Sequence, residues 1–271
     1  MIDEHDEAPY LGIDLAWSGK NETGLVALQE DGRISDAGWL ANTQDVADWI
    51  NEHAGEDSFT FIDAPLVIEN PEGMRECEKE VGRRYGSWKV FANASNLSST
   101  GQEGVALRRL LEERGFRYDD GTEGNEGGAR RIFECYPYTT IVGVRALGYD
   151  HERPRYKRKP PKMPAASWRE LRASETDELI RRVSDFVTED LPMDLTSHPE
   201  TLRLVDLPTP QSNVEAKHRE DLLDAALCAW TAALWDRYET QRCQVLGEDD
   251  ARINGRRATI IAPARESQRR R

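Results

Sequence analysis

The apolar run Tyr10–Trp17 carries a single carboxylate, Asp14, and constrains the fold more than any other stretch of the chain. Polar and acidic residues precede the run, and residues 18–23 have the composition of a turn, so the sequence predicts a short strand. A carboxylate on a buried strand costs several kcal/mol unless a cation or hydrogen-bond donors meet it. Asp14 therefore either has partners elsewhere in the chain or caps a turn at the strand end.

Three more strand patterns and one helix pattern follow this run. The first three strands are joined by tight turns, which predicts an antiparallel meander. A helix capped by Asn42 or Thr43 precedes the fourth strand, which ends in Asp63 shortly before a proline. The strands are predicted at Gly24–Gln29, Arg33–Leu40 and Ser58–Asp63, and the helix at Gln44–Ala54.

The rest of the chain predicts another strand with a carboxylate, several helices and a closing hairpin. Glu134 lies among apolar neighbours in a strand that ends before Pro137. The strongest helix pattern has an apolar second half and carries Asp221 and Asp224 near its start. We predict a strand at Arg130–Tyr136, helices at Gly73–Gly86, Gln102–Arg114, Thr139–Leu147, Trp168–Val187 and Val214–Tyr238, a short strand at Leu202–Val205, and a hairpin of Gln244–Leu246 with Thr259–Ile261.

This order of elements predicts an α/β fold with a mixed sheet, an antiparallel three-strand meander plus parallel strands, flanked by helices. The sequence has no internal repeat and no clear linker, so we expect a single domain over residues 1–271. Helical and loop insertions are expected at about residues 64–128 and 148–210. Open α/β sheets place ligands at the carboxyl ends of their strands, where Asp14 and Asp63 are expected.

Charge and composition limit the setting of the protein. The net charge is -14, and the 36 basic residues comprise seven lysines and 29 arginines, a composition similar to that of proteins from salt-loving organisms. No window approaches 18 apolar residues and the first residues lack signal-peptide features, so we expect a cytoplasmic protein that does not bind membranes. The four scattered cysteines predict buried free thiols. The oligomeric state stays open, with a homodimer among the alternatives.

Five carboxylates share apolar flanks, and we interpret them as one site. Converging acids repel one another unless a metal neutralises them, and oxygen-only ligands select hard cations such as Mg²⁺ or Mn²⁺. Two such ions about 4 Å apart activate a water and stabilise the leaving oxygen in phosphodiester cleavage. No serine or cysteine nucleophile motif, phosphate-binding loop or zinc-protease motif competes with this interpretation. The catalytic and metal-ligating candidates are Asp14, Asp63, Glu134, Asp221 and Asp224.

Basic residues near these acids are candidates for phosphate binding. The only strongly basic interior run, residues 153–162, contains prolines that exclude a helix, and it is either a phosphate contact or a solvated loop. Lys217 falls on the same helix face as the two late acids. The phosphate-binding candidates are Arg75, Lys157, Lys217 and His218.

Structural explanations stay open for each member of the set. Buried acids are often paired with arginines, and acids at a helix start favour its positive end. Coincidence across the whole set is a weaker explanation than coincidence for any single member. The alternatives are a turn cap for Asp63, a buried pair with Arg130 or Arg75 for Glu134, a helix-start role or a pair with Lys217 for Asp221 and Asp224, and a polar contact for His218.

Five motifs hold all the candidate residues except Lys157, at Gly12–Ala16, Ile62–Leu66, Gly73–Glu78, Glu134–Pro137 and Lys217–Ala225. In this order they resemble a domain-of-unknown-function family, number 429 of that series, which is described as a predicted ribonuclease H-like nuclease. The spacing of the two late acids is also similar to that in the helix of Holliday-junction resolvases. The resemblance covers nearly the whole chain and implies a ribonuclease H-like fold, with the five acidic assignments wherever the motifs align.

The leading hypothesis is a divalent-metal-dependent nuclease or phosphodiesterase, a hydrolase acting on nucleic acid or another phosphodiester. Asp14 would bridge two metal ions, Asp63 and Glu134 would complete one or both sites, and the late acids would close the set. The alternatives are an ATPase or phosphotransferase of the actin-like class, whose strands also begin with Gly-x-Asp, and a non-catalytic binding protein on the same fold. In dilute cytosol the acidic surface would repel nucleic acid.

Overall fold

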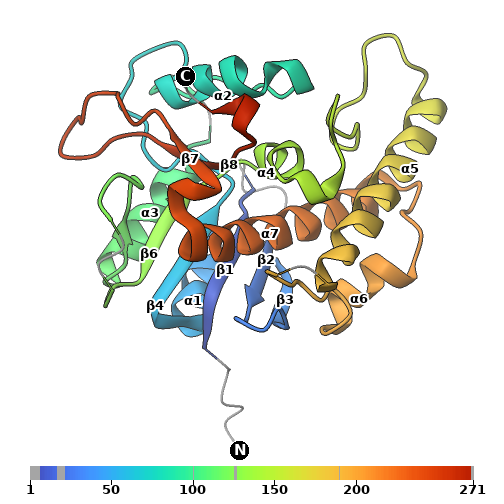
Figure 1. Ribbon diagram of the computed structural model, residues 1–271, viewed down its shortest axis with the longest axis horizontal. Coiled ribbons are helices and arrows are strands. Elements are labelled where there is room, and N and C mark those ends of the chain that lie inside the picture. Colours follow the sequence, from blue (N-terminus) through green and yellow to red (C-terminus); the bar gives the residue numbers. More distant parts are fainter. Residues whose placement is uncertain (1–6, 17–21, 100, 125–126, 189, 270–271) are drawn as a thin grey trace, which may run out of the picture.

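One mixed sheet forms the centre of the molecule, and its architecture confirms the predicted fold class (Figure 1). The computed structural model describes residues 7–16, 22–99, 101–124, 127–188 and 190–269. The six-stranded sheet has the order β3-β2-β1-β4-β6-β5, and a separate two-stranded sheet pairs β7 with β8. This α/β arrangement is consistent with the ribonuclease H-like fold that the resemblance implies.

The first three strands form the predicted antiparallel meander, and β4 and β6 continue it in parallel. Asp14 on β1 lies opposite Gly24 on β2, and Ile13 lies opposite Ile62 on β4. Because β1 and β4 are parallel, their carboxyl ends meet at one edge of the sheet. The strands are β1 Ala8–Asp14, β2 Thr23–Leu28, β3 Ile34–Leu40, β4 Ala54–Ile62, β5 Arg117–Tyr118, β6 Arg131–Glu134, β7 Cys243–Leu246 and β8 Ile260–Pro263.

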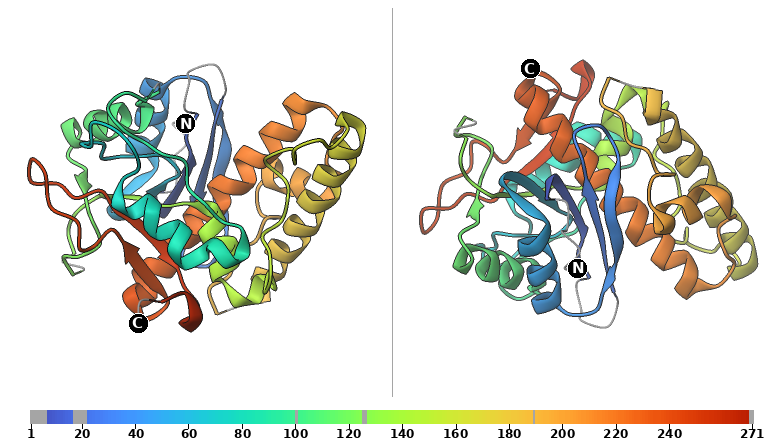
Figure 2. Two further views of the ribbon diagram at one scale, coloured as in Figure 1. Left: turned by 90° about the horizontal axis from the view of Figure 1, so that it is seen from above. Right: turned by 90° about the horizontal axis from the view of Figure 1, so that it is seen from below.

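Helices cover both faces of this sheet (Figure 2). On one face α1 and α3 share a core with Leu11 and Ile13, and on the other α7 shares a core with Val26 and Phe61. Asn42 caps α1 as predicted, because its side chain accepts a hydrogen bond of 2.9 Å from the amide of Asp45. The helices are α1 Thr43–His53, α2 Glu76–Tyr85, α3 Glu103–Glu113, α4 Pro137–Gly143, α5 Ala165–Ser184, α6 Pro199–Asp206 and α7 Asn213–Tyr238.

One predicted element is wrong, and one had no prediction. The segment predicted as a short strand at Leu202–Val205 lies inside helix α6, because Pro199 starts that helix and the His198 ring accepts from the amide of Glu200. The two-residue strand β5 was not predicted. The first predicted insertion, residues 64–128, contains α2, α3 and β5. The second, residues 148–210, contains α5 and α6. Residues 17–21, which cover the end of the first run and most of its predicted turn, lie outside the described residues.

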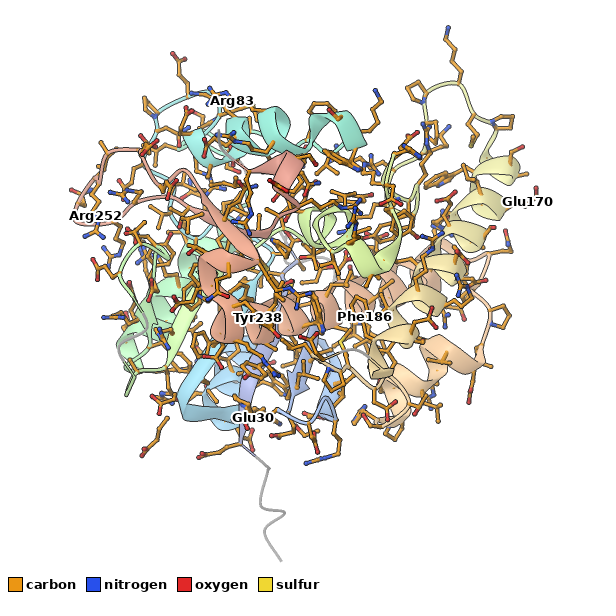
Figure 3. The ribbon with its side chains drawn as sticks, viewed as in Figure 1. Glu30, Arg83, Glu170, Phe186, Tyr238 and Arg252 are labelled. Atoms are coloured by element: carbon orange, nitrogen blue, oxygen red, sulfur yellow. The ribbon has the colours of Figure 1, made fainter. Side chains whose placement is uncertain are left out.

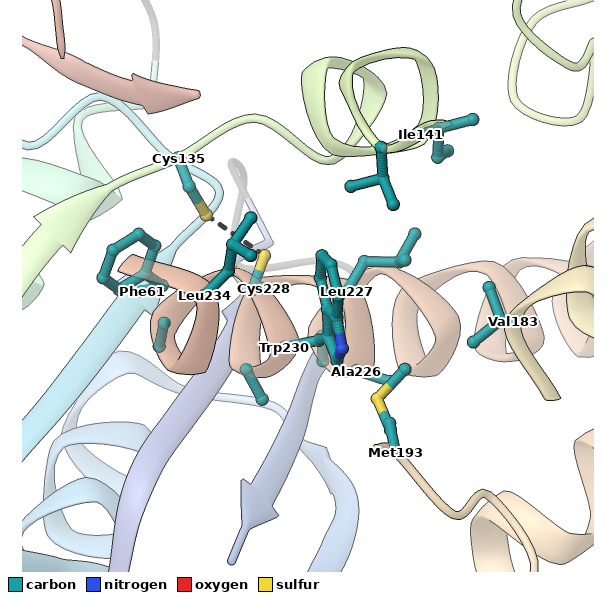
Figure 4. Close-up of a cluster of buried hydrophobic side chains, with 14 of the residues drawn as sticks. Phe61, Cys135, Ile141, Val183, Met193, Ala226, Leu227, Cys228, Trp230 and Leu234 are labelled. Atoms are coloured by element: carbon teal, nitrogen blue, oxygen red, sulfur yellow. Dashed lines mark hydrogen bonds between the residues drawn. The ribbon is translucent and has the colours of Figure 1, made fainter. Parts of the chain in front are cut away.

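The apolar second half of α7 is buried in the core, as Figure 4 shows. Trp230 donates a hydrogen bond of 2.8 Å to the carbonyl of Leu191, and the sulfur atoms of Cys135 and Cys228 lie 3.3 Å apart. All four cysteines are buried free thiols, as predicted. Among the described residues, no helix combines the length and apolar character needed to cross a membrane.

Gly12 sets the distance between β1 and α7. A Cβ added at this position would overlap backbone atoms of Ala225 and Ala229, whereas a Cβ at Gly38 on β3 would meet nothing within 4 Å. Protein interiors are close-packed, so an extra methyl group at such a contact forces the backbones apart. The α7 backbone therefore lies directly on β1.

We expect Gly12→Ala to lower the free energy of unfolding by about 2 kcal/mol or more, because the strand and the helix must separate. Gly38→Ala is the matched control, since it changes a strand glycine in open space and should alter stability by less than about 1 kcal/mol. Urea denaturation of both variants measures the difference. Equal effects of the two substitutions would contradict the close contact of β1 with α7.

Candidate metal centre

The sheet edge and helix α7 bring four of the five predicted acids together. Asp14 is the last residue of β1, and Asp63 follows β4, with its amide donating a 2.8 Å hydrogen bond to the carbonyl of Ile13. Asp221 and Asp224 lie in the first half of α7, which crosses this end of the sheet (Figure 1). Residues far apart in the sequence thus meet because parallel strands end together under one helix.

Three of these side chains form a group that could hold a cation. Asp14, Asp63 and Asp224 each offer a carboxylate oxygen, and the three oxygens lie within 4.8 Å of one another. Alongside burial, the negative charge of Asp221 raises the pKa of Asp14. An oxygen-only donor set of this kind fits a hard cation such as Mg²⁺ or Mn²⁺.

The electrostatics of the group indicate that its negative charge is incompletely compensated. Burial raises the pKa of Asp14 and of Asp63 well above the usual range, although Lys157 acts in the opposite direction. Burial also raises the pKa of Asp221 to about 6. The Oδ2 atoms of Asp14 and Asp221 are buried and accept no hydrogen bond from any described residue. Buried carboxylate oxygens without donors are what a metal ligand presents before its ion binds.

Two lysines and a tyrosine contact these acids. The Lys157 ammonium forms an ion pair with Asp224 and lies 3.8 Å from Oδ2 of Asp63. The Tyr156 hydroxyl donates a 2.7 Å hydrogen bond to Oδ1 of Asp224. Lys217 forms an ion pair with Asp221. The basic run 153–162 therefore reaches the acids, and both oxygens of Asp224 are in contact with it.

A cavity of about 300 Å³ opens above the carboxylates. Its acidic wall contains Asp14, Asp63 and Asp221, so a molecule in the cavity would reach the group directly. Other lining side chains are polar, aromatic or basic. They include Asn93, Tyr136, Tyr138, Lys157, Arg158 and Lys217.

Glu134 lies in a neighbouring buried ion pair. Its two oxygens accept hydrogen bonds of 2.8 and 2.6 Å from Arg75, and one also accepts a 2.9 Å bond from the amide of Leu66. Arg75 is held from its other side by Glu78 at 2.8 Å. This is the pairing left open as the alternative for Glu134. The pair fixes the segment directly after Asp63, which makes Glu134 and Arg75 positioning residues in this geometry.

His218 lies outside the cavity walls, although it was a phosphate-binding candidate. Its ring nitrogen lies 2.9 Å from the Glu22 carboxylate, and its carbonyl accepts a 3.0 Å hydrogen bond from the Trp39 indole. It therefore makes polar contacts near the start of α7. The two lysines among the phosphate-binding candidates, Lys157 and Lys217, lie in the cavity wall.

Tyr156, Tyr138 and Asn93 contribute to the site without having been predicted. Tyr156 is the only aromatic residue of the basic run, and Tyr138 directly follows the proline after the Glu134 strand. Tyr156 could have been predicted, because it is an isolated aromatic residue between basic residues and prolines. Asn93 lies in an irregular segment whose path the sequence pattern does not specify.

Comparison with known proteins places the chain in context. A family model described as a protein of unknown function, DUF429, matches residues 12–252 and so covers every motif that holds a candidate residue. Neither a curated protein nor a solved structure matches the chain.

We expect Asp14→Asn to raise the free energy of unfolding of the metal-free protein at neutral pH by about 1 kcal/mol or more, because it removes a buried charge. The raised pKa means that wild-type stability falls as pH rises from about 4, the unfolded-state value, through the folded-state value. The gain from Asp14→Asn should therefore shrink as pH is lowered toward about 4. Urea denaturation in EDTA across this pH range measures it.

Glu134→Gln is expected to act in the opposite direction. It should lower the free energy of unfolding by about 3 kcal/mol, because the Arg75 guanidinium would remain buried without its bidentate partner. The same denaturation experiment compares the two variants. A destabilising Asp14→Asn or a neutral Glu134→Gln would contradict this description of the two sites.

Proposed function

The chain belongs to the DUF429 family of proteins of unknown function, and we propose that it hydrolyses phosphodiester bonds with the help of a divalent cation. The observation that carries this proposal is the convergence of Asp14, Asp63 and Asp224, whose carboxylate oxygens lie within 4.8 Å of one another. Carboxylates that cluster at the ends of strands and face a polar cavity can bind Mg²⁺ or Mn²⁺ together with an anionic substrate.

The donor set supports a specific assignment of ligands. Asp14 would be the central ligand, because its buried Oδ2 accepts no hydrogen bond from a described residue. Asp63 and Asp224 complete the set. When bound, a divalent cation would supply Lewis acidity to activate a water and to neutralise the charge that builds on the phosphate. Glu134 acts indirectly, through its pair with Arg75.

The side chains around the ligands have distinct parts in the reaction. Hydrolysis joins a water oxygen to phosphorus, breaks the bond from phosphorus to the leaving oxygen, and moves a proton from the water to the leaving oxygen. Asp221, with its pKa of about 6, is suited to accept a proton near neutral pH. Lys157 and Lys217 line the cavity and would bind the phosphate oxygens.

Lys157 also has to change partners in this scheme. Its ammonium forms an ion pair with Asp224, one of the three residues that would hold a cation. With Asp224 engaged as a ligand, Lys157 would be free to contact a substrate phosphate in the cavity that it lines. Residues 153–162, all of them described, form no helix or strand that would oppose this movement.

We expect Mn²⁺ to stabilise the wild-type protein, by about 2.7 kcal/mol when its concentration is 100 times the dissociation constant. Asp14→Asn should abolish that shift and reduce kcat/KM for bis(p-nitrophenyl) phosphate at least about 100-fold. Asp119→Asn is the matched control, because Asp119 is equally buried but lies outside the centre, with a 2.8 Å bond from the Gly121 amide. It should leave both readouts near wild-type.

Thermal melting with and without Mn²⁺, together with the release of nitrophenol, makes these measurements. The proposal is wrong if the Asp14→Asn protein keeps full Mn²⁺-dependent hydrolysis. It is equally wrong if neither Mn²⁺ nor Mg²⁺ changes the melting temperature of the wild-type protein, since a cation that does not bind cannot assist the reaction.

A further inference from the structure

Two segments, residues 83–93 and 153–162, are rich in positive charge. Together they contain nine lysines and arginines and no aspartate or glutamate, in a protein whose net charge is -14. We call these two segments the basic surface. Figure 1 shows α2 and the connection from α4 to α5, which carry much of it, on the same side of the molecule.

Direct hydrogen bonds join the two segments. The amide of Arg153 donates to the carbonyl of Trp88 at 3.0 Å, and its guanidinium donates to the carbonyl of Lys89 at 2.9 Å. Arg158 donates to the side-chain oxygen of Asn93 at 2.9 Å. The positive charges of both segments therefore belong to one continuous surface.

Most of the positive charge on this surface lacks a carboxylate partner among the described residues. Elsewhere some exposed arginines pair with acids, as Arg203 does with Glu200 at 2.9 Å. On the basic surface, Arg153 instead donates to the Tyr138 hydroxyl, and Lys159 to the carbonyl of Met163. The members that form no ion pair with any carboxylate of a described residue are Lys89, Arg153, Arg158, Lys159 and Lys162. Cations left unpaired on an acidic protein are suited to bind an anion from outside.

The basic surface reaches the mouth of the carboxylate cavity. Asn93 and Arg158, which are joined by a hydrogen bond, both line that cavity, and so does Lys157. Any anionic chain lying along the surface would thus pass over Asp14 and Asp63. Its phosphates could contact the flanking cations while one phosphodiester faces the carboxylates.

An exposed aromatic side chain lies within the same surface. Phe91 is 58% exposed, and its ring lies against helix α2 at Gly82 and Gly86, where added Cβ atoms would be 3.5 and 3.3 Å from it. Tyr136, in the cavity wall, donates a 3.2 Å hydrogen bond to the Phe91 carbonyl. Exposed aromatic rings between cations are typical of surfaces that bind single-stranded nucleic acid, because the bases stack on the rings while the phosphates contact the positive charges.

We propose that the basic surface binds single-stranded nucleic acid and leads one of its phosphodiesters into the carboxylate cavity. The binding of the nucleic acid is inferred from the placement of charges and aromatic rings alone. The entry of a phosphodiester into the cavity rests on the proposed function. Asp14 is 8% exposed and Asp224 is fully buried, so the reacting phosphate must enter the cavity. A flexible single strand can bend into it, whereas a duplex has a persistence length of about 150 base pairs and cannot.

Binding is tested with Asp14→Asn protein in EDTA, so that cleavage plays no part. Fluorescence anisotropy with a labelled oligothymidine of about twelve nucleotides should show binding at low salt, and weaker binding of a duplex of the same length. Arg158→Ala with Lys159→Ala should weaken binding and reduce the salt slope by about 1.4, or about 0.7 for each lost phosphate contact. Phe91→Ala should weaken binding about tenfold and leave the slope unchanged.

Arg83→Ala and Arg203→Ala form a matched pair of controls. Both arginines lie on helices and pair with a glutamate, and their side chains are 57% and 65% exposed, but only Arg83, labelled in Figure 3, belongs to the basic surface. Arg83→Ala should reduce the salt slope and Arg203→Ala should not.

The inference is overturned if the oligothymidine does not bind, if the duplex binds as tightly, or if the substitutions on the basic surface act no differently from Arg203→Ala. Hydrolysis of bis(p-nitrophenyl) phosphate separates this result from the proposed function. Binding of the oligothymidine without hydrolysis of bis(p-nitrophenyl) phosphate contradicts the proposed function alone. Hydrolysis without strand binding contradicts the inference alone.

Discussion

The contact of helix α7 with strand β1 is the constraint on which the candidate site depends. Gly12 leaves no side chain between the strand and the backbone of Ala225, so the helix lies directly on the sheet. Asp224 precedes Ala225 on the helix, and Asp14 lies two residues beyond Gly12 on the strand. The same close packing that excludes a methyl group therefore brings two carboxylates together in a place with little water.

Such an arrangement is unfavourable unless cations accompany it. Lys157 and Lys217 supply part of the compensation, but burial still holds the pKa of Asp14 and Asp63 well above the usual range. A site organised only for stability would replace buried acids with apolar residues of similar volume, which is often the more stable choice. Retaining several buried acids around one cavity is instead typical of a centre whose ligand completes the charge balance.

Local sequence patterns predicted much of the fold, because each pattern depends on near neighbours. Asn42 at the start of α1 and the apolar half of α7 are examples, whereas α6 was missed because its cap comes from His198, outside the usual cap residues. The acids on parallel strands and on α7 were predictable as a group. The pairing of Glu134 with Arg75, and the insertion of Lys157 between acids, depend on tertiary contacts that spacing along the chain does not encode.

We propose that Asp14, Asp63 and Asp224 hold a divalent cation. Anomalous diffraction from crystals grown with Mn²⁺ tests it most directly, because the scattering locates the ion without relying on activity. We expect a peak about 2.1 Å from oxygen atoms of all three carboxylates, with the Lys157 ammonium moved away from Asp224. The account is contradicted if Mn²⁺ is absent from this position and Lys157 keeps its contact with Asp224.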